Sequence, residues 1–122
     1  MPKKILLIED DEILRGIITQ KFVKEGYKVV QAINGIDGLK AIDTERPDLV
    51  LLDILLPGMN GFEVLEKTKQ NPSLAKIPII ILSNLSRKED VEKGFKLGAT
   101  DYLIKVNFTS QEVMKKIKDI LQ

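Results

Sequence analysis

The feature that most constrains the fold is the run of four aliphatic residues at 49–52 (LVLL), which Asp53 follows directly. An apolar run without alternation is typical of a strand that is buried on both faces, as in a parallel sheet flanked by helices. Residues 6–8 (LLI) form a second such run, and residues 9–11 (EDD) follow it. The sequence therefore predicts two central parallel strands that both end in carboxylates.

Apolar runs and helical patterns alternate five times along the chain. Strands are predicted at residues 4–8, 27–32, 48–53, 77–82 and 102–104. Helices are predicted from a cap at Asp10 or Asp11 to about Lys24, before Pro47, around residues 62–65, at residues 86–97, and after Thr109. Such alternation with short connections favours an α/β fold, with a parallel sheet, right-handed crossovers and helices on both faces.

Several helices carry local signals at their ends and on their faces. Gly26 follows the first helix, as glycine often does just past a helix end. Thr109 and Glu112 have the spacing of a capping box for the last helix. Ile13 lies off the apolar stripe of the first helix, so we expect it to be exposed. That stripe consists of four side chains at helical spacing: Leu14, Ile17, Ile18 and Phe22.

Length and composition limit the classes of function. A chain of 122 residues is predicted to form one domain, residues 1–122. The net charge of +1 favours neither nucleic acid nor an anionic membrane as a partner. The absence of Cys and His excludes disulfides, thiolate metal sites and an imidazole base. No run approaches the roughly 18 apolar residues of a membrane-spanning helix, so a cytoplasmic location is expected.

The carboxylates that follow the first and third strands define a candidate site. Reacting groups in open parallel sheets gather at the carboxyl ends of the strands, where strand order reverses. If these two strands are neighbours, at least Glu9, Asp10 and Asp53 converge, and their like charges repel unless a hard cation is bound. This arrangement favours a magnesium-assisted phosphate site with Asp53 as candidate nucleophile. A single Asp at a strand end is, on its own, most often a turn or cap residue.

Two further strand ends carry groups that suit a phosphate. Ser83 ends the fourth strand and Lys105 ends the fifth. A phosphoryl group on Asp53 would carry about −1.5 to −2 charge, which Lys105 and magnesium would neutralise while Ser83 donates a hydrogen bond. Each residue alone is ordinary, because a strand-end Lys is usually solvated and a strand-end Ser usually caps a helix. Their combination is the stronger signal.

From Lys4 to Leu121 the chain resembles the receiver domain of two-component response regulators, in particular single-domain regulators of the chemotaxis or phosphorelay type. The resemblance implies a flavodoxin-like (βα)5 three-layer sandwich with strand order 2-1-3-4-5, in which the first and third strands are neighbours. It rests on Glu9-Asp10, Asp53, the loop Pro57-Gly58-Met59-Asn60-Gly61, Ser83, Gly98-Ala99, Tyr102 and Lys105.

The resemblance implies a phosphorylation site with a metal. Asp53 would accept a phosphoryl group from a sensor histidine kinase or a histidine phosphotransfer protein. Asp10 and Asp53 would bind Mg2+ directly, Glu9 would bind it through water, and the backbone carbonyl of Leu55 would add a ligand. A protein with this role takes part in its own phosphorylation and dephosphorylation without being a turnover enzyme.

The resemblance also implies a switch. Ser83 would contact the phosphoryl group, Lys105 would pair with it, and the ring of Tyr102 would enter the space that the Ser83 hydroxyl leaves. The surface of the fourth helix, fifth strand and fifth helix would then change and control the binding of a downstream protein. The alternative for Tyr102 is a packed ring with a hydrated hydroxyl. Receivers occur as monomers, and some dimerise weakly through this surface.

Two positions depart from the usual family pattern or vary within it. The family usually has proline after its lysine, often in a cis peptide, whereas this chain has Val106. A cis bond there would cost roughly 2.5 to 4 kcal/mol, so both a trans and a strained cis Lys105–Val106 bond are open. Leu55 and Asn84 occupy positions that tune phosphoryl lifetime in the family. Because Leu55 offers no polar group to orient water, we expect slow self-dephosphorylation.

Other classes of protein are less consistent with the residues. A haloacid-dehalogenase-type phosphohydrolase needs a second Asp where this chain has Leu55. A flavin-binding protein needs a glycine- or hydroxyl-rich phosphate loop where this chain has an acidic one, residues 9–11. A phosphorylation-independent interaction module and an excised N-terminal receiver of a larger regulator remain as alternatives. For the phosphorelay role, Ile13 and the loop around Pro57 are the candidate contacts for the kinase.

Overall fold

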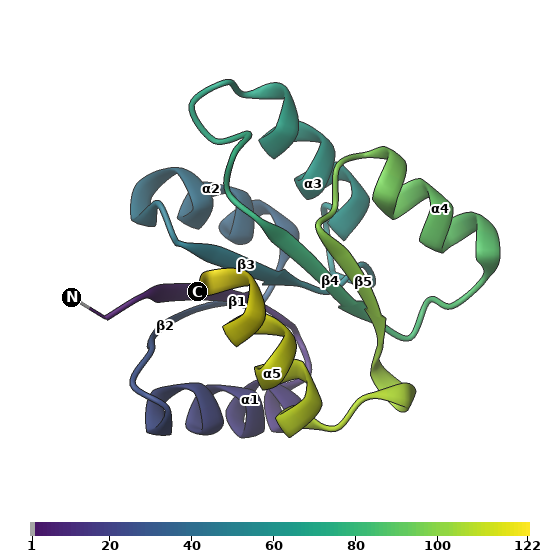
Figure 1. Ribbon diagram of the computed structural model, residues 1–122. Helices are drawn as coiled ribbons and strands as arrows, with labels where there is room; N and C mark the ends of the chain where they lie inside the picture. The colour runs from purple at the N-terminus through teal and green to yellow at the C-terminus, as the bar shows by residue number, and fades with distance from the viewer. Residues whose placement is uncertain (1) are drawn as a thin grey trace.

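The apolar runs form the strands of one sheet, and each strand is followed by a helix (Figure 1). The computed structural model describes residues 2–122. The strands are β1 (Lys4–Ile8), β2 (Lys28–Ala32), β3 (Leu49–Leu52), β4 (Ile79–Ser83) and β5 (Asp101–Ile104). The helices are α1 (Glu12–Lys24), α2 (Gly35–Glu45), α3 (Gly61–Gln70), α4 (Lys88–Lys96) and α5 (Ser110–Leu121), with a 3-10 turn η1 (Lys105–Asn107) before α5.

The sheet is parallel throughout, with the order β2-β1-β3-β4-β5. This order confirms the predicted flavodoxin-like fold. The central pair β1 and β3 is in register, with Ile8 opposite Leu52, and the backbone N–H of Asp53 donates to the carbonyl of Ile8 at 3.0 Å. The residues that follow these two strands, Glu9 and Asp53, therefore emerge side by side at the carboxyl edge of the sheet.

The central strands are apolar throughout because their alternate residues enter two different cores. Leu6, Ile8, Val50 and Leu52 pack in the core beneath α2, α3 and α4. Their neighbours in the chain, including Leu7, pack in the core beneath α1 and α5. Figure 1 shows α1 and α5 on one face of the sheet and α2, α3 and α4 on the other. The result is the predicted three-layer sandwich.

Side chains cap the N-termini of four of the five α-helices in residues 2–122. Asp11 caps α1, Asn34 caps α2 and Asn60 caps α3, each accepting a backbone N–H three residues on. Thr109 and Glu112 form the predicted capping box at the start of α5. Asn-Gly pairs are common in turns, but here Asn34-Gly35 begins a helix, because the Asn34 side chain accepts the backbone N–H of Asp37 at 2.8 Å.

One side chain assigned to the buried stripe of α1 is exposed. Leu14, Ile18 and Phe22 face the sheet, but Ile17 is 47% exposed. At about 100° of rotation per residue, the three inward side chains span only about 80° of the helix, and Ile17 lies about 100° from Ile18. The prediction for Ile17 was therefore wrong. The prediction for Ile13 is confirmed, since its side chain is 77% exposed.

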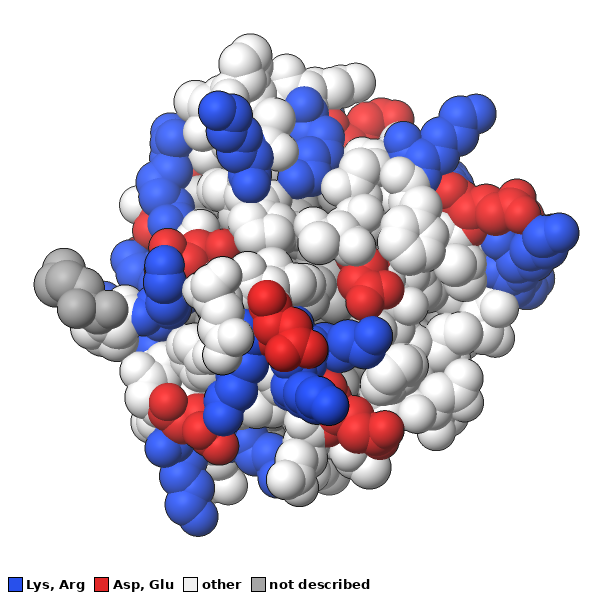
Figure 2. Space-filling model, viewed as in Figure 1, with Lys and Arg blue, Asp and Glu red and all other residues white. Residues whose placement is uncertain are grey.

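Charged side chains of both signs are interspersed over the face of the molecule that Figure 2 displays. This mixture agrees with the net charge of +1. Within residues 2–122, no helix is both long enough and apolar enough to cross a membrane.

Candidate functional site

Three carboxylates gather where β1 and β3 end. Glu9, Asp10 and Asp53 each place one carboxylate oxygen within 4.8 Å of the others. The side chains of Glu9 and Asp53 are buried, whereas Asp10 is exposed. Neighbouring buried carboxylates repel unless cations compensate their charge, and three oxygen donors at this spacing suit a hard divalent ion.

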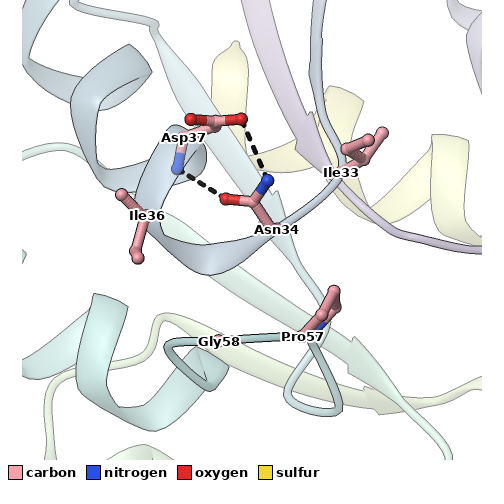
Figure 3. Close-up of a pocket in the computed structure, with 6 residues that line it drawn as sticks. All are labelled: Ile33, Asn34, Ile36, Asp37, Pro57 and Gly58. Carbon is pink, nitrogen blue, oxygen red and sulfur yellow. Dashed lines mark hydrogen bonds between the residues drawn. The ribbon is translucent and has the colours of Figure 1, made fainter.

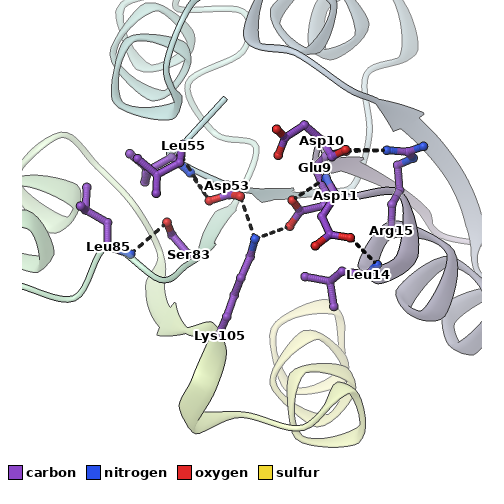
Figure 4. Close-up of polar contacts among 11 residues, drawn as sticks. Glu9, Asp10, Asp11, Leu14, Arg15, Asp53, Leu55, Ser83, Leu85 and Lys105 are labelled. Atoms are coloured by element: carbon purple, nitrogen blue, oxygen red, sulfur yellow. Dashed lines mark hydrogen bonds and ion pairs between the residues drawn. The ribbon is translucent and has the colours of Figure 1, made fainter. Parts of the chain in front are cut away.

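Lys105 supplies a cation to this cluster from the turn that follows the edge strand β5 (Figure 4). Its Nζ atom lies 2.7 Å from Oε1 of Glu9 and 2.8 Å from Oδ2 of Asp53. Burial lowers the pKa of Lys105, but hydrogen bonds from its ammonium to Asp53 and Glu9 outweigh burial and leave the pKa above its ordinary value. The ammonium is therefore a fixed positive charge between the two carboxylates.

The turn that carries Lys105 differs from the proline-containing form usual in the family. The Lys105–Val106 peptide is trans, as are the other peptide bonds in residues 2–122. Residues Lys105–Asn107 form the 3-10 turn η1, and Val106 points to solvent with 80% of its side chain exposed. A trans peptide thus accompanies the placement of Lys105 at the acidic cluster.

Burial has the largest effect on Glu9. It raises the pKa of the Glu9 carboxyl, the hydrogen bond from Lys105 opposes this, and the charge of Asp53 adds to it, so that the pKa is about 7. The second oxygen of Glu9 accepts the backbone N–H of Asp11 at 3.1 Å. Glu9 is thus directly paired with Lys105, and its predicted water-mediated metal contact stays a prediction.

Both oxygens of Asp53 have hydrogen-bond donors. Oδ1 accepts the backbone N–H groups of Ile54 at 2.7 Å and Leu55 at 3.3 Å, while Oδ2 accepts from Lys105. The start of α3 packs closely behind this turn, because a Cβ atom on Gly61 would lie 2.2 Å from the carbonyl oxygen of Asp53. The glycine at the end of the loop is therefore required for the turn that positions Asp53.

Arg15 is a site residue that the sequence analysis missed. Its Nη1 atom donates to the carbonyl oxygens of Glu9 at 3.0 Å and Asp10 at 3.4 Å (Figure 4). It reaches them from the first turn of α1, so it braces the backbone of the acidic loop. The available signal was an Arg one helical turn after an Asp that caps the helix.

Ser83 and Tyr102 meet at the loop between β4 and α4. The buried Ser83 Oγ accepts the backbone N–H of Leu85 at 3.3 Å, and the Tyr102 hydroxyl donates to the carbonyl of the same residue. Burial, with the nearby charges of Asp90 and Asp53, raises the pKa of Tyr102 to about 12. The tyrosine hydroxyl is thus hydrogen-bonded to the backbone of the loop before α4, and the two interpretations of Tyr102, as a switch residue or as a packed ring, both stay predictions.

The ring of Tyr102 is buried, with 7% of the residue exposed. A Cβ atom on Gly94 of α4 would approach the ring to 2.8 Å, so the glycine leaves room for it. The movement of the ring on phosphorylation stays a prediction.

A parallel sheet with three carboxylates and a lysine at its carboxyl edge is the arrangement that the resemblance to receiver domains implies. The family model of the response regulator receiver domain matches residues 5–118. The chain therefore belongs to the family of response regulator receiver domains. Members of this family are signalling proteins of two-component systems rather than turnover enzymes, bind Mg2+ at an acidic pocket, and interact with histidine kinases or phosphotransfer proteins.

Curated relatives include long and short proteins. The transcriptional regulatory protein AfsQ1 of Streptomyces coelicolor is 41% identical over 101 residues, which are 83% of this chain and 44% of that protein. The regulatory protein PhoP of Bacillus subtilis is 36% identical over the whole chain, and the match covers 50% of PhoP. The chain thus spans about half the length of these relatives. Sporulation initiation phosphotransferase F of Bacillus subtilis is 36% identical, with 99% of this chain and 95% of that protein covered.

Solved structures agree with this assignment. A CheY-like response regulator receiver domain protein from Methanospirillum hungatei JF-1 superposes with a TM-score of 0.91 at 30% identity, covering 99% of this chain and 94% of that one. The phosphorylated cyanobacterial phytochrome response regulator RcpA superposes with a TM-score of 0.84 at 28% identity, covering 98% of this chain and 91% of that one.

Proposed function

We propose that this chain is a phosphorelay receiver whose Asp53 accepts a phosphoryl group from a histidine kinase or a histidine phosphotransfer protein. The observation that carries the proposal is the pairing of Asp53 with Lys105 at 2.8 Å beside two further carboxylates. The relatives support it, because they include a phosphotransferase and a response regulator that is phosphorylated, by their names.

The donor set fits Mg2+. Asp10 and Asp53 would bind the ion directly, Glu9 through water, and Leu55 through its backbone carbonyl. When bound, the ion neutralises charge that develops on the transferring phosphoryl oxygens. Asp10 is exposed, so it is free to turn toward an ion that enters from solvent.

The transfer needs little chemistry from the protein beyond positioning. A carboxylate oxygen of Asp53 forms a bond to phosphorus while the P–N bond to the donor histidine breaks, and the electron pair of that bond stays on the imidazole nitrogen. The ammonium of Lys105 already lies against Asp53, so it can pair with a phosphoryl oxygen after transfer. The Ser83 hydroxyl donates to another phosphoryl oxygen.

This contact of Ser83 couples the site to a distant surface. When Ser83 Oγ turns toward the phosphoryl group, the N–H of Leu85 loses its acceptor and the loop before α4 rearranges. Tyr102 binds the carbonyl of the same residue, so β5 and α4 respond together. The surface of α4, β5 and α5 then controls binding of a downstream protein.

Intact mass spectrometry tests the proposal. Wild type and Asp53→Ala are incubated with phosphoramidate in the presence and absence of Mg2+, and the same samples with beryllium fluoride are followed by NMR. We expect one phosphoryl adduct that requires both Asp53 and Mg2+, with chemical-shift changes that extend to Tyr102. Absence of the adduct and of the shifts would refute the proposal and favour a phosphorylation-independent interaction module.

The lengths of two relatives support a second candidate. AfsQ1 and PhoP are transcriptional regulators about twice as long as this chain. The chain would then act as the receiver part of a larger regulator, with the same chemistry at Asp53. Sequencing of the complete reading frame and its transcript distinguishes a receiver that acts alone from the receiver part of a larger regulator. Only the larger regulator requires coding sequence beyond Gln122.

A further inference from the structure

Five of the eight large apolar side chains that are exposed in residues 2–122 belong to the carboxyl edge of the sheet, where Asp53 lies. They follow strands β1, β2, β3 and β5 at the carboxyl edge of the sheet: Ile13, Ile33, Ile36, Leu55 and Val106. Strand order places β2 at one side of β1 and β3, and β5 at the other. The acidic cluster at Asp53 is therefore flanked by apolar groups on both sides.

On the β2 side these groups form a groove. Ile33 and Ile36 at the start of α2 face Pro57 and Gly58 of the loop after β3, and the open cavity between them has a volume of about 390 Å3 (Figure 3). Ile33 and Ile36 are 51% and 50% exposed. Two loops from neighbouring parts of the sheet edge thus build one apolar depression.

The polar side chains in the groove, Asn34 and Asp37, are hydrogen-bonded to each other. Asn34 Nδ2 donates to Asp37 Oδ2 at 2.9 Å, and Asn34 Oδ1 accepts the backbone N–H of Asp37 at 2.8 Å (Figure 3). These groups complete the start of α2, so the groove presents mainly apolar contact to a partner. The groove therefore suits an apolar side chain of a partner protein.

We propose that this groove, formed by Ile33, Ile36 and Pro57, seats an apolar side chain of the histidine-bearing donor protein. The proposal rests on the proposed function, since it assigns part of the surface through which the donor reaches Asp53. Asp53 is 4% exposed, so a donor histidine must be brought close to the sheet edge by the surface around it. Pro57 lies four residues after Asp53 in the same loop.

The donor surface that covers this loop therefore continues onto the wall of the groove. A phosphohistidine carried within an apolar patch would fit an acidic site that has exposed apolar side chains on both sides. Apolar rims of this kind exclude water from the central contact, which strengthens the charge interactions there. The groove is a second contact on the β2 side, separate from Ile13 on α1.

Phosphotransfer kinetics test the proposal. The probes are the catalytic cores of a panel of histidine kinases, autophosphorylated with radiolabelled ATP, and the fastest donor to wild type is used throughout. The double variant Ile33→Ser, Ile36→Ser is compared with Val23→Ser, which changes an apolar side chain of similar exposure, 55%, on α1. We expect the KM for the kinase to rise about tenfold in the double variant and to stay unchanged in Val23→Ser.

Two further measurements separate the outcomes. Labelling by phosphoramidate should be equal in all three proteins, because a small donor does not contact the groove. Titration with the unphosphorylated kinase core should shift the NMR signals of Ile33 and Ile36. An unchanged KM, or a groove-dependent dimer in sedimentation with normal phosphotransfer, would overturn the groove assignment alone. Failure of phosphoramidate to label wild type would instead overturn the proposed function itself.

Discussion

Ser83 and Tyr102 bind opposite sides of the same residue, since the Oγ atom of Ser83 accepts the N–H of Leu85 and the hydroxyl of Tyr102 donates to its carbonyl. One side chain belongs to β4 beside Asp53 and the other to β5 beside α4. A change in the hydrogen bond of Ser83 therefore acts on a peptide unit that Tyr102 also holds. The two residues form a direct physical link between the site and the α4-β5-α5 surface.

Tyr102→Phe should weaken this link while leaving the candidate phosphoryl acceptor, Asp53, intact. The ring still fills its space, but the carbonyl of Leu85 loses its donor, so we expect a loss of about 1 kcal/mol in the free energy of unfolding. Hydrogen exchange in residues 84–87 should become faster, with phosphoramidate labelling of Asp53 unchanged. Tyr27→Phe, at the other tyrosine, is the control. Equal exchange rates in both variants would show that the hydroxyl does not hold the loop.

Lys105→Met should destabilise the protein most at high pH. It leaves Glu9 and Asp53 buried without their shared cation, which we expect to cost about 3 kcal/mol at pH 8 in urea denaturation. The cost should be smaller at pH 5.5, where Glu9 holds a proton. Lys116→Met removes a more exposed pair with Asp101 at 3.8 Å and should change stability by less than about 1 kcal/mol. A similar loss in both variants would contradict the assigned role of Lys105.

Glu9 should make stability depend on pH. Its pKa rises from 4.5 to about 7 on folding, mainly through burial, so the folded protein holds more protons than the unfolded chain between these pH values. The free energy of unfolding contributed by Glu9 therefore falls as pH rises through this window. Denaturation at successive pH values should show this slope in wild type and its loss in Glu9→Gln.

Glu112→Gln is the matched control for this pH dependence. Hydrogen bonds with Thr109 lower the pKa of Glu112, so its stabilising contribution is present above pH 4.5 and is lost only below it. The control should keep the slope between pH 5 and 7. Carboxyl NMR of Glu9 measures the midpoint directly, and a midpoint near 4.5 would refute the assigned pKa.

Arg15→Gln should weaken Mg2+ binding. The guanidinium braces the carbonyls of Glu9 and Asp10, and residues that orient metal ligands typically change affinity by about tenfold when replaced. Isothermal titration calorimetry with Mg2+ measures this. Arg46→Gln is a close control, because Arg46 also donates to two backbone carbonyls, those of Asp43 and Ser73, at another place on the surface. Equal Mg2+ affinities would restrict Arg15 to a general structural role.

Ile13→Asp should weaken transfer from a protein donor without unfolding the chain. The side chain is 77% exposed near the acidic loop, so a new charge there disturbs docking and leaves the core intact. Transfer from the kinase probe is compared with circular dichroism and with Val23→Asp, farther along α1. Transfer at the wild-type rate would remove Ile13 from the docking surface.

The sequence was sufficient to predict the sheet and the convergence of the carboxylates. Unbroken runs at β1 and β3 indicate burial on both faces, and the resemblance fixed their order in space. The helix start at Thr109 was predictable because a capping box is a local pattern. The exposure of Ile17 was not predictable, because residue spacing alone does not show which edge of an apolar stripe faces solvent.

The contacts that sequence analysis missed all join residues through backbone atoms or across strands. Arg15 binds carbonyl oxygens, and Tyr102 binds the carbonyl of Leu85, which any residue type would present. The direct ion pair of Lys105 with Glu9 depends on how η1 turns after β5. Such contacts are set by tertiary geometry, so residue types and their spacing do not reveal them.

The ion pairs of Lys105 also connect the ends of strands that are not neighbours in the sheet. It touches the residues that follow β1 and β3 while belonging to the segment after β5, and β4 lies between β3 and β5 in the sheet. One side chain thus bridges a span of four adjacent strands. A change in the charge of Asp53 would therefore alter the electrostatic force on Lys105, and through it on the turn that follows β5.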